Sequence, residues 1–179
     1  MTAKECLTGR RSIRNFKPDT ISHELLASII ETTSYSPSWK NTQTVRYIAV
    51  EGNLKNQIAA ECYSLFPGNA HAAANAPMLI VLTAIKGRCG FERDGSFSTS
   101  KKDSWQMFDA GIAAQTFCLA AWEQGLGSVI QGLYDEEKII NLLNIPDDQE
   151  LIALIPVGYP DEEPVAPRRK SVDDLLLYK

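Results

Sequence analysis

The chain has 179 residues, 44% hydrophobic and 22% charged, which fits one compact domain over residues 1–179 with a full core. Its net charge of -4 disfavours a nucleic-acid binder, because such proteins neutralise phosphates with a broad basic face. The 4 cysteines are scattered without a C-x-x-C pair, so neither a zinc site nor a disulfide framework is expected. With no signal pattern and no apolar run of about 18 residues, the predicted location is the cytoplasm.

A first predicted helix, about residues 4–9, leads directly into Arg10-Arg11-Ser12-Ile13-Arg14. Three guanidinium groups and a hydroxyl in an acidic chain suit an anion, because a guanidinium matches phosphate oxygens two at a time and keeps its charge. A solvated basic turn is the competing interpretation, and the cluster alone favours it.

Ser22 is the predicted N-cap of a second helix, with Ile21 and Leu26 at the positions of a hydrophobic staple. This helix is expected to end near Ser36-Pro37. Residues 36–43 then place amides and hydroxyls beside a proline and a tryptophan. Amides donate and accept together, which suits the edge of a planar heterocycle, and a tryptophan can cover an apolar face. An ordinary polar loop is the alternative.

Residues 45–50 are a predicted strand, 54–66 a helix and 77–85 a buried strand. Residues 87–102 have no apolar period. They are expected to form a mobile loop, and a lid and a disordered insertion are both open.

Asp103 is expected to cap a long helix reaching about Gln124, with Gln106 in a capping-box arrangement. The middle of this helix, residues 110–114, is rich in Ala and Gly. An interior glycine costs about 1 kcal/mol relative to alanine, so close packing against a neighbour such as another subunit is expected.

The remaining predicted elements are a strand at 128–131, a helix at 135–143 and a strand at 151–157. A proline-rich acidic arm, residues 161–167, is expected to deliver Arg168-Arg169-Lys170 to a specific place.

The sequence lacks the common motifs of active sites in which the protein's own side chains carry out the chemistry. There is no G-x-S-x-G elbow and no P-loop, and Gly125-x-Gly127 follows a helix where a dinucleotide fingerprint follows a strand. His23 and His71 are expected in structural or surface roles, and Asp109 has no partner that marks a general acid and base. No catalytic residue and no metal site are therefore predicted, which leaves a bound cofactor to do the chemistry.

Six motifs, taken in order, resemble the FMN-dependent nitroreductase family along nearly the whole chain. They are Arg10-Arg11-Ser12-Ile13-Arg14-x-Phe16, Ser36-Pro37-Ser38-x-x-Asn41-x-Gln43, Asp109-x-Gly111-x-Ala113-x-Gln115, Gly125-Leu126-Gly127-Ser128, Gly158-Tyr159-Pro160 and Arg168-Arg169.

The resemblance implies an α+β fold, with a mixed central β-sheet flanked by helices, in an intertwined homodimer that holds two FMN molecules at the subunit interface. It also implies an FMN-binding site built from Arg10, Arg11, Ser12, Arg14, Asn69, Ile130, Gln131, Gly132, Arg168 and Arg169, and from Pro37, Ser38, Trp39, Asn41 and Gln43 of the other subunit. Asn41 and Gln43 are expected to fix the loop that holds Pro37, Ser38 and Trp39. Arg10, Ser12, Arg168 and Arg169 are expected on the phosphate side. Pro37, Ser38 and Trp39 are expected along the isoalloxazine ring.

The implied activity is a ping-pong reaction in which NADH or NADPH gives a hydride to flavin N5 and a nitroaromatic, quinone or enone then takes the electrons. Arg14 is the candidate for stabilising charge on the reduced ring. An FMN-binding carrier without efficient turnover is the alternative, and an interaction protein without flavin is a third. Residues 72–74 are alanines where many members have a basic residue, and the chain lacks the extra helices of larger members.

Overall fold

The computed structural model describes residues 1–63 and 67–179. Its helices are α1 (Ala3–Gly9), α2 (His23–Thr33), the 3₁₀ helix η1 (Trp39–Asn41), α3 (Gly52–Glu61), α4 (Pro67–Asn75), α5 (Ser104–Glu123) and α6 (Glu136–Leu143). Its strands are β1 (Val45–Glu51), β2 (Met78–Ile85), β3 (Gly127–Ser128) and β4 (Gln149–Gly158).

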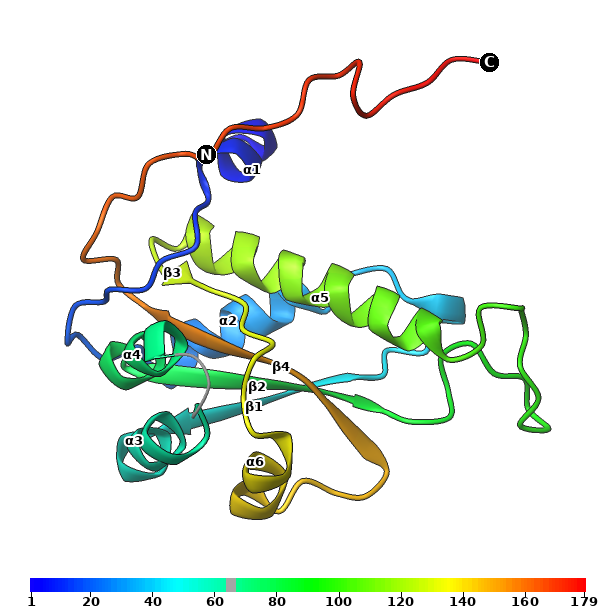
Figure 1. Ribbon diagram of the computed structural model, residues 1–179, viewed down its shortest axis with the longest axis horizontal. Helices are drawn as coiled ribbons and strands as arrows, with labels where there is room; N and C mark the ends of the chain where they lie inside the picture. The colour runs from blue at the N-terminus through cyan, green and yellow to red at the C-terminus, as the bar shows by residue number, and fades with distance from the viewer. Residues whose placement is uncertain (64–66) are drawn as a thin grey trace.

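One four-stranded sheet, in the order β1-β2-β4-β3, forms the centre of the molecule (Figure 1). The three strand pairs are antiparallel. A parallel bridge between Ser12 and Ser128 adds the arginine-rich segment before α2 to the edge of the sheet, so the sheet is mixed. This arrangement of one sheet between helices confirms the α+β class expected from the sequence.

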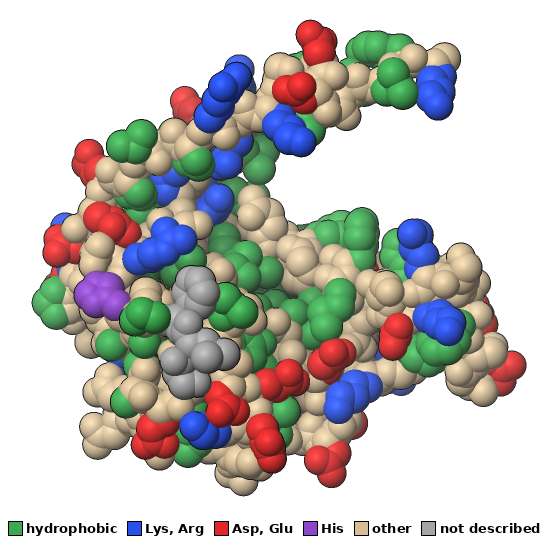
Figure 2. Space-filling view, viewed as in Figure 1, with side chains coloured by type: hydrophobic (Ala, Val, Ile, Leu, Met, Phe, Trp, Pro, Cys, Tyr) green, Lys and Arg blue, Asp and Glu red, His purple; other side chains and the backbone are tan. Residues whose placement is uncertain are grey.

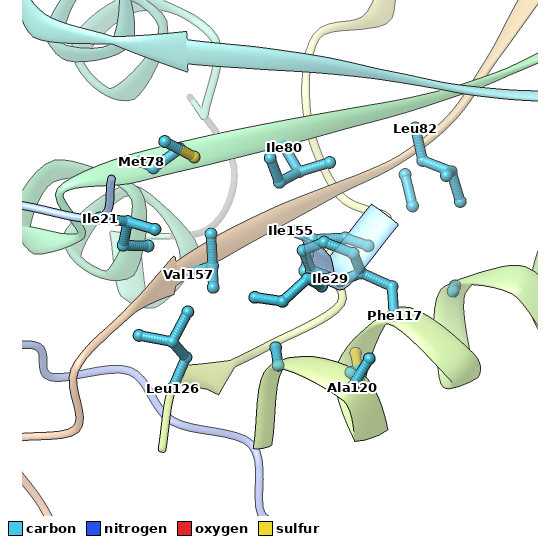
Figure 3. Close-up of a cluster of buried hydrophobic side chains, with 14 residues drawn as sticks. Ile21, Ile29, Met78, Ile80, Leu82, Phe117, Ala120, Leu126, Ile155 and Val157 are labelled. Atoms are coloured by element: carbon cyan, nitrogen blue, oxygen red, sulfur yellow. The ribbon is translucent and has the colours of Figure 1, made fainter. Parts of the chain in front are cut away.

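Helices cover both faces of the sheet, so the interior strand β2 is buried along nearly its whole length. On one face Met78, Ile80 and Leu82 pack against α2 and α5 (Figure 3). On the other face Leu79 and Val81 pack against α3, α4 and α6. Successive residues of a strand point to opposite faces of the sheet. Because both faces of β2 are covered by helices, nearly every position of this strand is apolar.

The expected start of α2 is confirmed. The Leu25 N–H donates to Ser22 Oγ at 3.1 Å, and Ile21 and Leu26 both pack in the core. The helix ends at Thr33, slightly before the predicted end.

Three local expectations need correction. Asp103 makes no side-chain cap, and the Gln106 amide donates to Glu150 instead of closing a capping box. Helix α4 was not expected. Pro67 suits a first helical turn and alanines are the strongest helix formers, so its sequence is compatible with a helix. The helix predicted over 54–66 spans Gly52–Glu61, and residues 64–66 lie outside the described residues.

The segment 87–102 contains a short hairpin, closed by a bridge between Phe91 and Phe97. The two phenylalanine rings lie 4.8 Å apart, and Trp105 Nε1 donates to Thr99 Oγ1 at 2.8 Å. This segment is therefore tied to the start of α5.

Beyond β4 the chain forms an extended tail that projects away from the rest of the molecule (Figure 2). Within the described ranges, no helix is both long and apolar enough to cross a membrane.

Candidate functional site

Residues 10–14, called here the arginine segment, lie against β3. The Ile13 N–H donates to the Ser128 carbonyl at 3.1 Å, and Ile13 is 1% exposed. A Cβ on Gly127 would stand 2.5 Å from Ile13 Cγ1, so the contact requires a glycine at this position. Close packing therefore fixes the backbone of the segment.

The three arginines of the segment have different environments. The Arg11 guanidinium turns back to the end of α1 and donates to the carbonyls of Thr8 (2.7 Å) and Arg10 (2.8 Å), a favourable place for a cation. Arg14 is exposed. Arg10 Nε is buried and has no hydrogen-bond partner within residues 1–63 and 67–179. A buried unpaired donor costs about 1–3 kcal/mol, so Arg10 is the arginine best suited to receive an anion.

Two further predicted residues, Asn69 and Gln131, contact each other beside this segment. The Gln131 amide is 2% exposed, donates to the Asn69 carbonyl at 3.1 Å and accepts from the Tyr63 hydroxyl at 2.7 Å. Asn75 connects α4 to the arginine segment by donating to the Arg14 carbonyl at 3.0 Å. The structure thus brings together residues 10–14, 69 and 130–132, and we call this group the arginine half-site.

Glu162, at the start of the tail, is attached to the same region. Its carboxylate accepts the N–H groups of Arg14 and Asn15, the latter at 3.1 Å, and the Asn15 amide at 2.7 Å. Burial raises the pKa of Glu162, but these hydrogen bonds outweigh it and the net pKa lies below the ordinary value. The tail therefore leaves the molecule from a fixed point beside the arginines.

Residues 36–43, called here the Trp39 loop, form the second group of predicted residues. Lys40, Asn41 and Gln43 all have positive φ (46°, 56° and 48°), a region that costs an L-residue roughly 1–2 kcal/mol. Inside the loop the Gln43 N–H donates to Ser38 Oγ at 3.1 Å. Such a strained loop needs support from outside.

That support comes from α5 and from the 87–102 segment. Asp109 Oδ2 accepts the Trp39 N–H at 2.8 Å, the Trp39 and Trp105 rings lie 4.9 Å apart, and Lys40 Nζ pairs with Glu92 at 2.9 Å. Two cavities, of about 390 and 280 Å³, flank the loop. Pro37, Ser38 and Asp109 line both of them.

The two groups lie at opposite ends of α5. The Trp39 loop bonds to Asp109, whereas Gly9, next to Arg10, lies beside Trp122, whose Nε1 would stand 3.4 Å from a Cβ on Gly9. Thirteen residues of helix separate these contact points, which is about 20 Å at 1.5 Å per residue. Arg168 and Arg169 are exposed on the tail and make no hydrogen bond or ion pair with residues 10–14 in the described part of the chain. Within one chain, the predicted site residues therefore form two separate groups.

Asp109, Cys89 and Glu162 were not identified as site residues from the sequence. Their contacts join residues that lie 20 to 148 positions apart, which no local pattern encodes. The sequence signal that could have identified Asp109 is a carboxylate directly before the apolar, small-residue segment 110–114 of a helix. No metal-binding cluster occurs among the described His, Cys, Asp and Glu residues.

Comparisons with known proteins show the family to which the chain belongs. The sequence pattern of the Nitroreductase family matches residues 7–159. The chain is 31% identical to a nitroreductase family protein from Clostridium novyi NT, whose crystal structure superposes with a TM-score of 0.76 over 90% of this chain and 87% of that one. An FMN-dependent nitroreductase from Clostridium difficile R20291 is 29% identical, with a TM-score of 0.72 over 96% and 94% of the two chains. An NADPH-flavin oxidoreductase from Vibrio harveyi is 29% identical over 92% of this chain and 68% of its own length. The chain therefore belongs to the nitroreductase family.

Proposed function

We propose that this protein is an FMN-dependent NAD(P)H oxidoreductase that reduces small electrophiles such as nitroaromatics, quinones or enones. The observation that carries the proposal is the arginine half-site. In an acidic chain, Arg10 presents a buried unpaired donor beside a backbone segment fixed by close packing. The cofactor and coenzyme named for the Clostridium difficile and Vibrio harveyi relatives support it.

The residues present fit FMN. The Arg10 guanidinium is free to pair with a phosphate, and Arg168 and Arg169 add cations from the tail. The exposed Ile130 and Gly132 flank the buried Gln131 and offer backbone groups to the ring edge. When bound, FMN supplies a ring that accepts a hydride and gives up two electrons again. The chain's part is to hold, orient and charge-stabilise that ring.

We further propose that each FMN site combines the arginine half-site of one protomer with the Trp39 loop of a second copy. The separation of about 20 Å along α5 supports this, because one protomer does not offer both halves to the same ring. On the outer side of α5, Met107 is 47% and Phe108 60% exposed, and on the tail Leu175 and Leu177 are 72% and 75% exposed. Exposed apolar side chains on α5 and on the tail are suited to contacts with a second copy of the chain.

In this arrangement Arg14 faces the ring rather than the phosphate. Its side chain is exposed, and its backbone is held by Asn75 and Glu162. A cation at that place stabilises negative charge on the reduced ring. We expect Arg14→Ala to slow reduction by NADH or NADPH more than it weakens FMN binding. Equal effects on both would contradict this role.

The decisive experiment is stopped-flow reduction of the FMN-loaded protein by NADH and by NADPH, followed by reoxidation with a panel of acceptors. Rapid reduction and reoxidation support an oxidoreductase. FMN binding without either step supports a carrier. Protein that acquires no flavin absorbance with added FMN would overturn the flavoprotein proposal.

A further inference from the structure

We propose that Asp109 is a positioning residue, whose buried carboxyl oxygen holds the Trp39 loop in the conformation that meets the flavin ring. The inference rests on the proposed FMN site and assigns a role there to Asp109 and, through it, to Cys89.

The first observation is that two donors converge on one oxygen. Asp109 is 4% exposed, and its Oδ2 accepts both the Trp39 N–H at 2.8 Å and the Cys89 S–H at 3.0 Å. No Lys or Arg of the described chain pairs with this carboxyl. A buried polar group is kept at a cost, so its contacts need a structural or functional reason.

The second observation is the strain in the loop that Asp109 holds. Three of the five non-glycine residues with positive φ in the described ranges lie at positions 40–43, directly after the bonded Trp39 amide. Hydrogen bonds within the loop do not connect it to the rest of the protein. The hydrogen bond from the Trp39 N–H to Asp109 connects the loop to α5, a helix of 20 residues.

The third observation is that Cys89 is suited to be a permanent donor. Its side chain is fully buried, and burial first, then the hydrogen bond to Asp109, raises the pKa of the thiol to about 12. The S–H is therefore retained at physiological pH and orients the Asp109 oxygen toward Trp39. The segment 87–102, expected as a mobile loop, thus contains near its start a residue, Cys89, that supports the Trp39 loop through Asp109.

The test compares three variants of the full-length protein. Asp109→Ala removes the acceptor, Asp109→Asn keeps one acceptor oxygen, and Asp103→Ala deletes an exposed carboxyl at the start of the same helix. FMN affinity and the visible circular dichroism of bound FMN are measured together with hydrogen exchange of residues 36–43 in the absence of FMN.

We expect Asp109→Ala to raise the Kd for FMN about tenfold or more, to change the flavin circular dichroism and to accelerate exchange in residues 36–43 but not in β2 or β4. Asp109→Asn is expected to restore all three readouts, and Asp103→Ala to match the wild type. A stable Asp109→Ala protein with wild-type affinity and exchange would overturn the inference, and so would an Asn variant as impaired as the Ala variant.

The failure of the inference is distinguishable from failure of the proposed function. If the wild type binds no FMN, the proposed function is wrong. The inference about Asp109 is wrong separately if hydrogen exchange of residues 36–43 in Asp109→Ala is as slow as in the wild type, because Asp109 then does not hold the Trp39 loop. If Asp109→Ala does not fold, Cys89→Ala carries the test, because it removes only the S–H. It is expected to accelerate exchange in residues 36–43, with Cys89→Ser restoring the wild-type rate, and unchanged exchange in Cys89→Ala would contradict the inference.

Discussion

The arginine half-site and the Trp39 loop achieve a fixed geometry by different means. The arginine segment is held by apolar close packing, with Ile13 pressed against Gly127 beside β3. The Trp39 loop is held by a few polar contacts against backbone strain. Dense packing resists any change in volume, whereas a hydrogen-bonded loop tolerates volume changes and responds to the loss of one acceptor. The comparison indicates that the arginine segment is the more rigid of the two and the Trp39 loop the more adjustable.

The largest effect is expected for Gly127→Ala. The new Cβ would stand 2.5 Å from Ile13 Cγ1, and overpacking of this kind costs about 1–3 kcal/mol. Urea unfolding is expected to show this loss of stability, and FMN affinity is expected to fall with it. Gly68→Ala is the control, because a Cβ there meets nothing within 4 Å. Equal stability of the two variants would contradict the packing account.

Arg10→Ala tests whether the rigid half-site is built around an anion. We expect the Kd for FMN to rise about tenfold to a hundredfold, since hydrogen bonds to charged groups contribute about 1.5–3 kcal/mol. The unfolding free energy of the flavin-free protein is expected to stay unchanged or to rise, because a buried unpaired donor is removed. Fluorescence titration with FMN and urea unfolding measure the two quantities. A loss of stability without a loss of affinity would assign Arg10 a purely structural role.

The difference between the half-sites also explains what the sequence could predict. The three long strands and the Ser22 cap follow from local patterns, and the structure contains them. The α+β class follows from the family resemblance and is also found, whereas the strand predicted at 128–131 is reduced to Gly127–Ser128. The environment of Arg11 does not follow, because its guanidinium can equally reach an anion or the end of α1. The Asp109 contact with Trp39 spans 70 positions, and its partner is a backbone amide without any residue signature. Long-range polar contacts of this kind are visible only in the fold.

Strain in the Trp39 loop is tested by comparing Lys40→Gly with Lys40→Ala. Both variants lose the ion pair with Glu92, so the difference between them isolates the backbone. At a φ of 46° we expect the glycine variant to be more stable by about 1 kcal/mol. In ordinary helical backbone the order is reversed, with alanine more stable by about 0.5–1 kcal/mol. Thermal unfolding of both proteins gives the sign, and a more stable alanine variant would show that the loop is unstrained.

The smallest expected effect concerns the attachment of the tail by Glu162. Its pKa in the folded protein is lowered, so its contribution is complete above the ordinary value of 4.5 and is lost as the pH falls through the lower folded value. Limited proteolysis of the tail is expected to accelerate as the pH drops below that point. In Glu162→Gln the acceleration should be missing. A wild-type tail whose cleavage is independent of pH would mean that the carboxylate does not anchor it.

The central claim, that one FMN site is shared between two protomers, is tested most directly by subunit complementation. Arg10→Ala and Trp39→Ala chains carrying different tags are co-expressed, and the heterodimer is isolated through both tags. Its two shared sites are unequal, because one combines both substituted halves and the other combines both intact halves. We predict one FMN bound per heterodimer with wild-type affinity, at FMN concentrations where neither homodimer binds. A heterodimer that binds FMN no better than the two homodimers would contradict the account.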